Sequence, residues 1–152
     1  MLDNPICAER RGKLTGIYQH SIDAKGRLFI PARLREELGT VFYVTLSMEE
    51  KCLWAFSNDS WERFTEKIKA MPIAKQIRMR AFYSHAAKCD LDGQGRILLP
   101  QTLRDAREIK RSITVVGAGD RAEFWDSEEF AVKDAKEMTP ENIAAVFTEF
   151  DI

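Results

Sequence analysis

Two short segments place acidic, basic and glycine residues in the spacing of a tight turn. The first is DAKGR at residues 23–27, and the second is DGQGR at residues 92–96. An aspartate side chain can accept hydrogen bonds from backbone amides two residues further on, and glycine supplies the positive φ that such turns need. We therefore predict two turns, organised by Asp23, Gly26, Asp92, Gly95 and Arg96.

The basic side chains around the first turn are of the kind that bind nucleic acid. Lys and Arg neutralise phosphates, and a two-stranded ribbon or its turn fits the major groove, where Arg can bond guanine O6 and N7 together. We predict that Arg27 contacts a base or a phosphate and that Lys25 contacts a phosphate, with Arg33 and Arg35 in support. The second turn carries Gln94 in place of Lys25, so we expect it to contact DNA more weakly or not at all.

Each of these arginines also has a purely structural interpretation. An arginine four residues after an aspartate can pair with it and hold the turn, as Arg27 can with Asp23 and Arg96 can with Asp92. Arg35 can equally be a solvated helix residue. Both alternatives stay open at the level of the sequence.

The charges are unevenly distributed, although the net charge is only −1. Residues 1–35 hold seven Lys or Arg against three Asp or Glu, and residues 75–111 hold nine against four. Residues 120–152 hold three against ten. A clustered basic face, and not net charge, indicates nucleic-acid binding, so two basic segments offset by an acidic tail are compatible with it. An ordinary mixed surface explains the charges equally well.

Residues that could form a catalytic or metal site do not gather in any pattern. His20 and His85 are the only histidines and are not at equivalent positions of the two segments. Cys7, Cys52 and Cys89 have no C-x-x-C spacing. We predict that the chain is not an enzyme, needs no cofactor or metal, takes no small-molecule substrate, and carries its cysteines as reduced, partly buried thiols.

No apolar run approaches the ~20 residues that a transmembrane helix needs. Residues 1–14 lack an apolar stretch suited to secretion and include the charged segment ERRGK at 9–13. We therefore expect a cytoplasmic protein that has no membrane partner.

The two turns belong to a longer internal repeat. Residues 22–31 (IDAKGRLFIP) align without a gap with residues 91–100 (LDGQGRILLP), and a Leu-Arg pair follows each at 34–35 and 103–104. Chance alignment of Asp, Gly, Arg, Pro, Leu and Arg over so short a span is improbable. The chain therefore contains two copies of one small unit.

Each copy has the pattern β-α-β-β-α, preceded by a lead-in strand. In copy one we predict strands at 14–22, 27–30, 41–46 and 52–56, with a helix at 32–38. In copy two we predict strands at 87–91, 96–99, 113–116 and 122–125, with a helix at 101–107. A closing helix starts near Asp59, which has capping-box spacing to Glu62, and its counterpart starts near Asp126.

A helical connector joins the copies. Residues 62–86 have an apolar face, and Pro72 marks a break between two helices. We assign this face to Phe64, Ile68, Ile77 and Phe82.

A last helix is predicted from Pro140 to Phe150, capped by Thr139. The apolar residues of the C-terminal segment suggest that it packs on the body, namely Phe130, Val132, Ile143, Val146, Phe147 and Phe150.

The predicted fold class is α+β. The chain divides into a first repeat at 16–59, a helical connector at 60–85, a second repeat at 86–129 and a C-terminal helical tail at 130–152. A unit of this size struggles to bury a core alone, so we expect the two copies to share one core about a pseudo-twofold axis.

The doubled motif resembles the paired signature of the MraZ family, within the wider group of AbrB-like regulators. The resemblance covers residues 13–150. It implies a swapped-hairpin-like β-barrel with flanking helices and a ring-shaped homo-oligomer. It also implies association with the nucleoid and binding to direct repeats in the promoter of the family's own cell-division and cell-wall gene cluster.

The resemblance leaves one alternative function. AbrB-like units also occur in antitoxins, where a tail neutralises a partner toxin, and the acidic C-terminal helix could serve as such a tail. The apolar residues of this tail distinguish it from a disordered low-complexity arm.

Overall fold

The computed structural model describes residues 12–152, and these form an α+β fold with two antiparallel sheets. Cys7 and most of the charged segment at 9–13 lie outside the described residues. The first copy contributes β1 (Ile17–Ser21), β2 (Arg27–Phe29), α2 (Ala32–Leu38), β3 (Val41–Leu46), β4 (Cys52–Ser57) and α3 (Asn58–Lys69). The second contributes β5 (Ala87–Asp90), β6 (Arg96–Leu98), α6 (Gln101–Ala106), β7 (Ser112–Gly117), β8 (Ala122–Asp126) and α7 (Ser127–Glu137). The predicted α+β class is confirmed.

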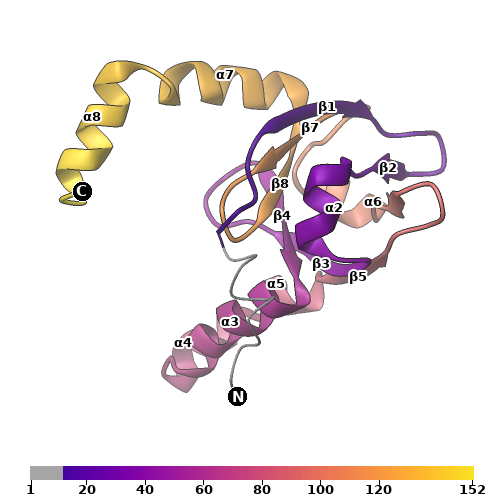
Figure 1. Cartoon of the computed structure of the whole chain (residues 1–152). Helices are drawn as coiled ribbons and strands as arrows, with labels where there is room; N and C mark the ends of the chain where they lie inside the picture. Colours follow the sequence, from indigo (N-terminus) through magenta and orange to yellow (C-terminus); the bar gives the residue numbers. More distant parts are fainter. Residues whose placement is uncertain (1–11) are drawn as a thin grey trace.

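The two copies exchange their first strands. The larger sheet has six strands in the order β1-β7-β8-β4-β3-β5, so β1 of copy one pairs with β7 of copy two and β5 pairs with β3 in return. The smaller sheet pairs β2 with β6. Each sheet therefore needs both copies, and neither repeat could form these pairings alone (Figure 1).

A pseudo-twofold axis relates the copies. Leu28 and Ile97 occupy the same position of the repeated motif, and they lie directly opposite each other in the β2–β6 pair. Trp54 and Glu123 are likewise opposite in the β4–β8 pair. A residue that faces its own counterpart lies on the symmetry axis, so the axis passes through both pairings.

One hydrophobic core serves both repeats, as expected. Apolar side chains of the two copies are buried together at equivalent positions, namely Leu28 and Ile97, Ile30 and Leu99, and Leu34 and Leu103. Each of these side chains is at most 1% exposed. The short strands and helices that carry the two turns are thus anchored in the centre of the molecule.

The first strand is shorter than predicted. It starts at Ile17, because Gly16 has a positive φ of 98° that interrupts the extended backbone. Leu14 still contributes, through an isolated bridge to Gly119. The segment before the strand therefore remains attached to the end of β7.

The connector forms three helices and not two. Pro72 precedes α4 (Ile73–Ile77), which confirms the predicted break, and a second break separates α4 from α5 (Arg80–Ser84). The predicted capping box of α3 is wrong, because Ser57 caps this helix by accepting a hydrogen bond from the Ser60 amide at 3.1 Å.

The apolar face of the connector is also shorter than predicted. Ile68 and Phe82 are buried in an aromatic cluster with Phe56 and Trp125, and Phe64 packs against it. Ile77 is 54% exposed, and α4 contributes no residue to this cluster.

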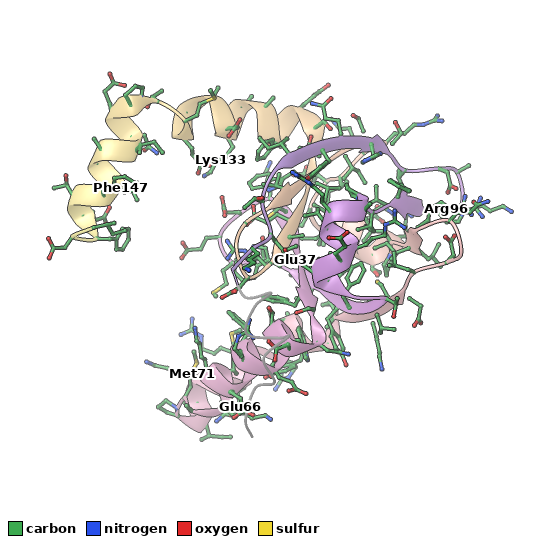
Figure 2. All side chains as sticks on the ribbon, viewed as in Figure 1. Glu37, Glu66, Met71, Arg96, Lys133 and Phe147 are labelled. Carbon is green, nitrogen blue, oxygen red and sulfur yellow. The ribbon has the colours of Figure 1, made fainter. Side chains whose placement is uncertain are left out.

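The C-terminal segment departs most from the prediction. α8 (Pro140–Glu149) is capped as expected, since Thr139 Oγ1 accepts from the Asn142 amide at 3.2 Å. Phe130 is buried, but the other apolar residues expected to pack are 39–65% exposed, namely Val132, Ile143, Val146, Phe147 and Phe150. α7 and α8 project from the sheets, and Phe147 lies far from the core (Figures 1 and 2).

Cys52 and Cys89 are free and buried, whereas the sequence indicated partly buried thiols. Burial raises the pKa of the Cys52 thiol to about 12 and that of Cys89 to about 11. The thiolate is the reactive form, so neither should react at pH ~8 while the chain is folded. Titration of a Cys7→Ser variant with a thiol reagent should show no fast reaction in buffer and release of both thiols in denaturant. A fast-reacting thiol in the folded variant would contradict this burial.

Within residues 12–152, no helix has the length and apolar character required to cross a membrane. The same part of the chain brings together no group of three or more His, Cys, Asp or Glu side chains that could hold a metal ion.

Candidate nucleic-acid interface

The first turn is organised by one carboxylate. Asp23 Oδ1 accepts hydrogen bonds from the backbone amides of Lys25 at 3.0 Å and Arg27 at 2.8 Å. Its Oδ2 accepts from the Arg27 Nε at 2.7 Å. Gly26 has a φ of 84°, a conformation that favours glycine, and its amide donates to the Asp23 carbonyl at 3.0 Å. The turn is therefore held by both its backbone and its ion pair.

The second turn repeats this geometry. Asp92 Oδ1 accepts from the amides of Gln94 at 2.8 Å and Arg96 at 2.9 Å, and Oδ2 accepts from the Arg96 Nε at 3.0 Å. Gly95 has a φ of 76°. The structure thus places all five predicted turn-organising residues in the two turns.

The ion pairs leave part of each guanidinium available. Both Arg27 and Arg96 engage their aspartate through Nε, which leaves the two terminal amino groups able to donate elsewhere. The side chains are 34% and 27% exposed. The structural and the DNA-binding interpretations of Arg27 are therefore compatible, because an arginine held by Nε can present its other edge to a ligand.

The two turns lie at the same end of the molecule. They project together on the side away from α7 and α8, where Figure 2 labels Arg96 (Figures 1 and 2). Backbone hydrogen bonds join the copies behind them, from the Leu99 amide to the Gly26 carbonyl at 2.8 Å and from the Ile30 amide to the Gly95 carbonyl at 2.9 Å. Lys25 and Gln94 are both exposed, so the main difference between the turns is this one charge.

The other two predicted DNA-binding residues, Arg33 and Arg35, have different surroundings in the structure. Arg33 is exposed on the first turn of α2. Arg35 is half-buried, and its guanidinium lies over the Phe29 ring, 5.2 Å from the centroid, and against Gly95 of the other copy. Arg104 likewise lies against Gly26. Sequence reasoning missed these contacts between copies, because nothing in the repeat shows which copy an arginine faces.

Acid is expected to loosen the turns. The backbone amide of Arg27 lowers the pKa of the Asp23 carboxyl, assisted by its guanidinium and the Lys25 amide, and the Arg96 amide lowers that of Asp92 in the same way. A lowered native pKa stabilises the fold above the unfolded value of ~3.9, and this stabilisation is lost as the pH falls through the native value.

The free energy of unfolding should therefore decrease as the pH falls from ~5 to ~2, partly because of these two groups. Urea unfolding across this range should show a shallower pH dependence in an Asp23→Asn/Asp92→Asn variant. An unchanged dependence would contradict the contribution of the two carboxylates.

Comparison with known proteins places the whole repeat in one family. The family model described as "MraZ protein, putative antitoxin-like" matches residues 14–80 and again residues 82–147. Each matched segment contains one of the two turns.

Three relatives share the name Transcriptional regulator MraZ, which is the name of a regulator and not of an enzyme. The one from Heliobacterium modesticaldum is 40% identical over 141 residues, which are 90% of this chain and 98% of the relative. The one from Carboxydothermus hydrogenoformans is 46% identical over 116 residues, or 74% and 80% of the two chains. The one from Ligilactobacillus salivarius is 38% identical over 141 residues, or 90% and 98%. Because the family model matches both halves and these relatives align over most of their length, the chain belongs to the MraZ family.

Proposed function

We propose that this chain is a sequence-specific DNA-binding transcriptional regulator that presents its first turn to double-stranded DNA. The observation that carries the proposal is the first of the two hydrogen-bonded turns at one end of the molecule, with the exposed cation Lys25 and the partly exposed Arg27. A turn with such side chains suits phosphate contact and major-groove readout. The names of the relatives support the same function.

Within this function, copy one makes the main contact. Arg27 reads a base or a phosphate, Lys25 contacts a phosphate, and Arg33 adds a supporting contact. The target is a set of direct repeats in the promoter of the chain's own cell-division and cell-wall gene cluster. A regulator of this kind works in the cytoplasm and is associated with the nucleoid.

We further propose that the chain acts as a ring-shaped homo-oligomer whose repeats close a swapped-hairpin-like β-barrel. The exchange of β1 and β5 between the copies supports the barrel. The exposed apolar side chains of α8, such as Ile143 and Phe147, support association with further copies. A single turn offers few phosphate contacts, so several tethered turns are needed for tight binding through effective concentration.

A gel-shift titration on the DNA upstream of the chain's own gene tests the function. We expect binding that weakens steeply with salt, and far weaker binding to a fragment with one site than to one with several evenly spaced sites. Equal affinity for both fragments, or for unrelated DNA, would overturn the proposal.

Light scattering at micromolar concentration should show an assembly larger than a dimer, and a Phe147→Asp variant should be smaller.

An antitoxin function is the second candidate. The description of the family model includes the term antitoxin-like, and the exposed face of α8 offers a surface that a toxin could cover. This function predicts that the chain neutralises a toxin encoded beside it and that Phe147→Asp abolishes neutralisation. If α8 is needed for self-association but the chain neutralises no toxin, the result would favour the regulator.

A further inference from the structure

An arginine of each repeat lies on the turn of the other repeat. A Cβ atom placed on Gly95 would lie 2.5 Å from the Arg35 Nη1, and one placed on Gly26 would lie 3.0 Å from the Arg104 Nη2. Real Cβ contacts are essentially never as short as the first distance. The two guanidinium groups therefore lie directly against the glycines of the turns, and a side chain at Gly95 would force Arg35 to shift.

Both arginines are themselves held in place. Arg104 Nε donates to the Leu99 carbonyl at 3.2 Å, and the amide of the same Leu99 donates to the Gly26 carbonyl at 2.8 Å. Leu99 therefore hydrogen-bonds both Arg104 and the first turn. On the other side, the Phe29 ring supports Arg35 through a cation–π contact at 5.2 Å.

We propose that the arginines brace the turns crosswise, so that Arg104 of copy two positions the first turn and Arg35 of copy one positions the second. Arg104 then acts on DNA binding through Lys25 and Arg27, without contacting DNA itself. This assignment replaces the DNA contact expected for Arg35 from the sequence. Its consequence for DNA rests on the proposed function, but the brace itself does not.

The crossed arrangement predicts that the two equivalent arginines have different effects on DNA binding. If copy one reads DNA, a change in copy two at Arg104 weakens binding, whereas the equivalent change in copy one at Arg35 does not. A simple electrostatic role would give comparable losses for both, because both carry one positive charge at the same end of the molecule.

Hydrogen exchange measured by mass spectrometry on the full chain tests the brace without DNA. Arg104→Ala should speed exchange at the turn amides of residues 23–27 and leave those of residues 92–96 unchanged; the amides of Ile30 and Leu99 are excluded, because each bonds a turn of the other copy. Arg35→Ala should do the reverse. Faster exchange confined to the arginine's own repeat, or equal in both, would overturn the crossed brace.

DNA affinity measured at several salt concentrations tests the functional consequence. We expect Arg104→Ala to weaken binding about tenfold, equivalent to ~1.4 kcal/mol, with little change in salt slope. Removal of a direct bond to a phosphate would instead reduce the slope by ~0.9. Arg104→Lys keeps the charge but not the flat guanidinium, so it should not restore affinity.

Two control variants complete the test. Arg35→Ala and Arg78→Ala each remove one positive charge and should bind DNA as tightly as the original chain. Full rescue by Arg104→Lys, or an unaltered affinity in Arg104→Ala, would overturn the positioning role. If the unmodified chain bound no DNA, the proposed function would fail, whereas the exchange experiment would still decide the brace.

Discussion

Gly117→Ala is expected to destabilise the fold by about 3 kcal/mol or more, at the upper end of the cost of overpacking. A Cβ at this position would lie 2.2 Å from the Thr15 nitrogen, 2.5 Å from its Cα and 2.6 Å from the Leu14 carbonyl carbon. All three are backbone atoms, so no side-chain rotation can relieve the clash. The segment before β1 would have to move away from β7.

That movement would also break specific interactions. The Gly117 amide donates to the Gly16 carbonyl at 2.9 Å, and Leu14 and Gly119 exchange backbone hydrogen bonds at 3.0 and 2.8 Å. The Leu14 side chain, now buried in the core, would be withdrawn from it. The loss therefore combines steric strain, hydrogen bonds and apolar burial.

Urea unfolding of Gly117→Ala beside Gly93→Ala measures the effect. Gly93 has nothing within 4 Å of an added Cβ, so its variant should lie within ~0.5 kcal/mol of the original chain. Similar unfolding free energies for the two variants would refute the close packing of the segment before β1 on the end of β7.

The elements of the repeat could be predicted because their signals are local. Proline after the second strand, glycine in the turn and alternating apolar residues each act within a few residues, so β2, α2 and their counterparts lie close to the predicted positions. The strand exchange is not local. β1 could satisfy its hydrogen bonds with a strand of either copy, and only packing of the complete chain decides in favour of β7.

The same limit explains the errors in the helices. A periodic apolar face indicates that a helix will be covered, but it does not identify the covering surface. Phe82 is buried in the aromatic cluster, whereas Phe147 is 50% exposed because no part of the described chain covers it. Ser57 outcompetes Asp59 as a cap because β4 ends there, a boundary that depends on its pairing with β3.

At the candidate site, the turn residues were predictable and the bracing arginines were not. Asp23 and Gly26 act on atoms within four residues of themselves. Arg104 acts on a turn almost 80 residues earlier in the chain, and its contact follows from the symmetry of the fold. The sequence shows that the two motifs are equivalent, but equivalence alone does not show that they face each other.

Arg27→Ala is expected to lower the affinity for promoter DNA by ~1–3 kcal/mol for each engaged subunit, the value of one bidentate contact to guanine. The turn itself should survive. The largest effect that lowers the Asp23 pKa is the Arg27 backbone amide, which alanine retains, so this pKa should stay below its ordinary value in the variant. The variant therefore removes the reading group while the turn keeps its main support.

Arg96→Ala is the matched control for this experiment, because it removes the same ion pair from the second turn. Both variants lose one partly exposed ion pair of guanidinium with carboxylate, and their thermal stabilities should fall by similar, small amounts. Only Arg27→Ala should lose DNA affinity, because only the first turn also carries Lys25.

Lys25→Gln, which gives the first turn the side chain of the second, should reduce the salt slope by ~0.9 for each phosphate that is no longer neutralised. An Arg27→Ala protein that is folded and assembled yet binds promoter DNA with unaltered affinity would falsify the assignment of the reading turn, whereas equal losses in both arginine variants would show that the two turns read DNA together.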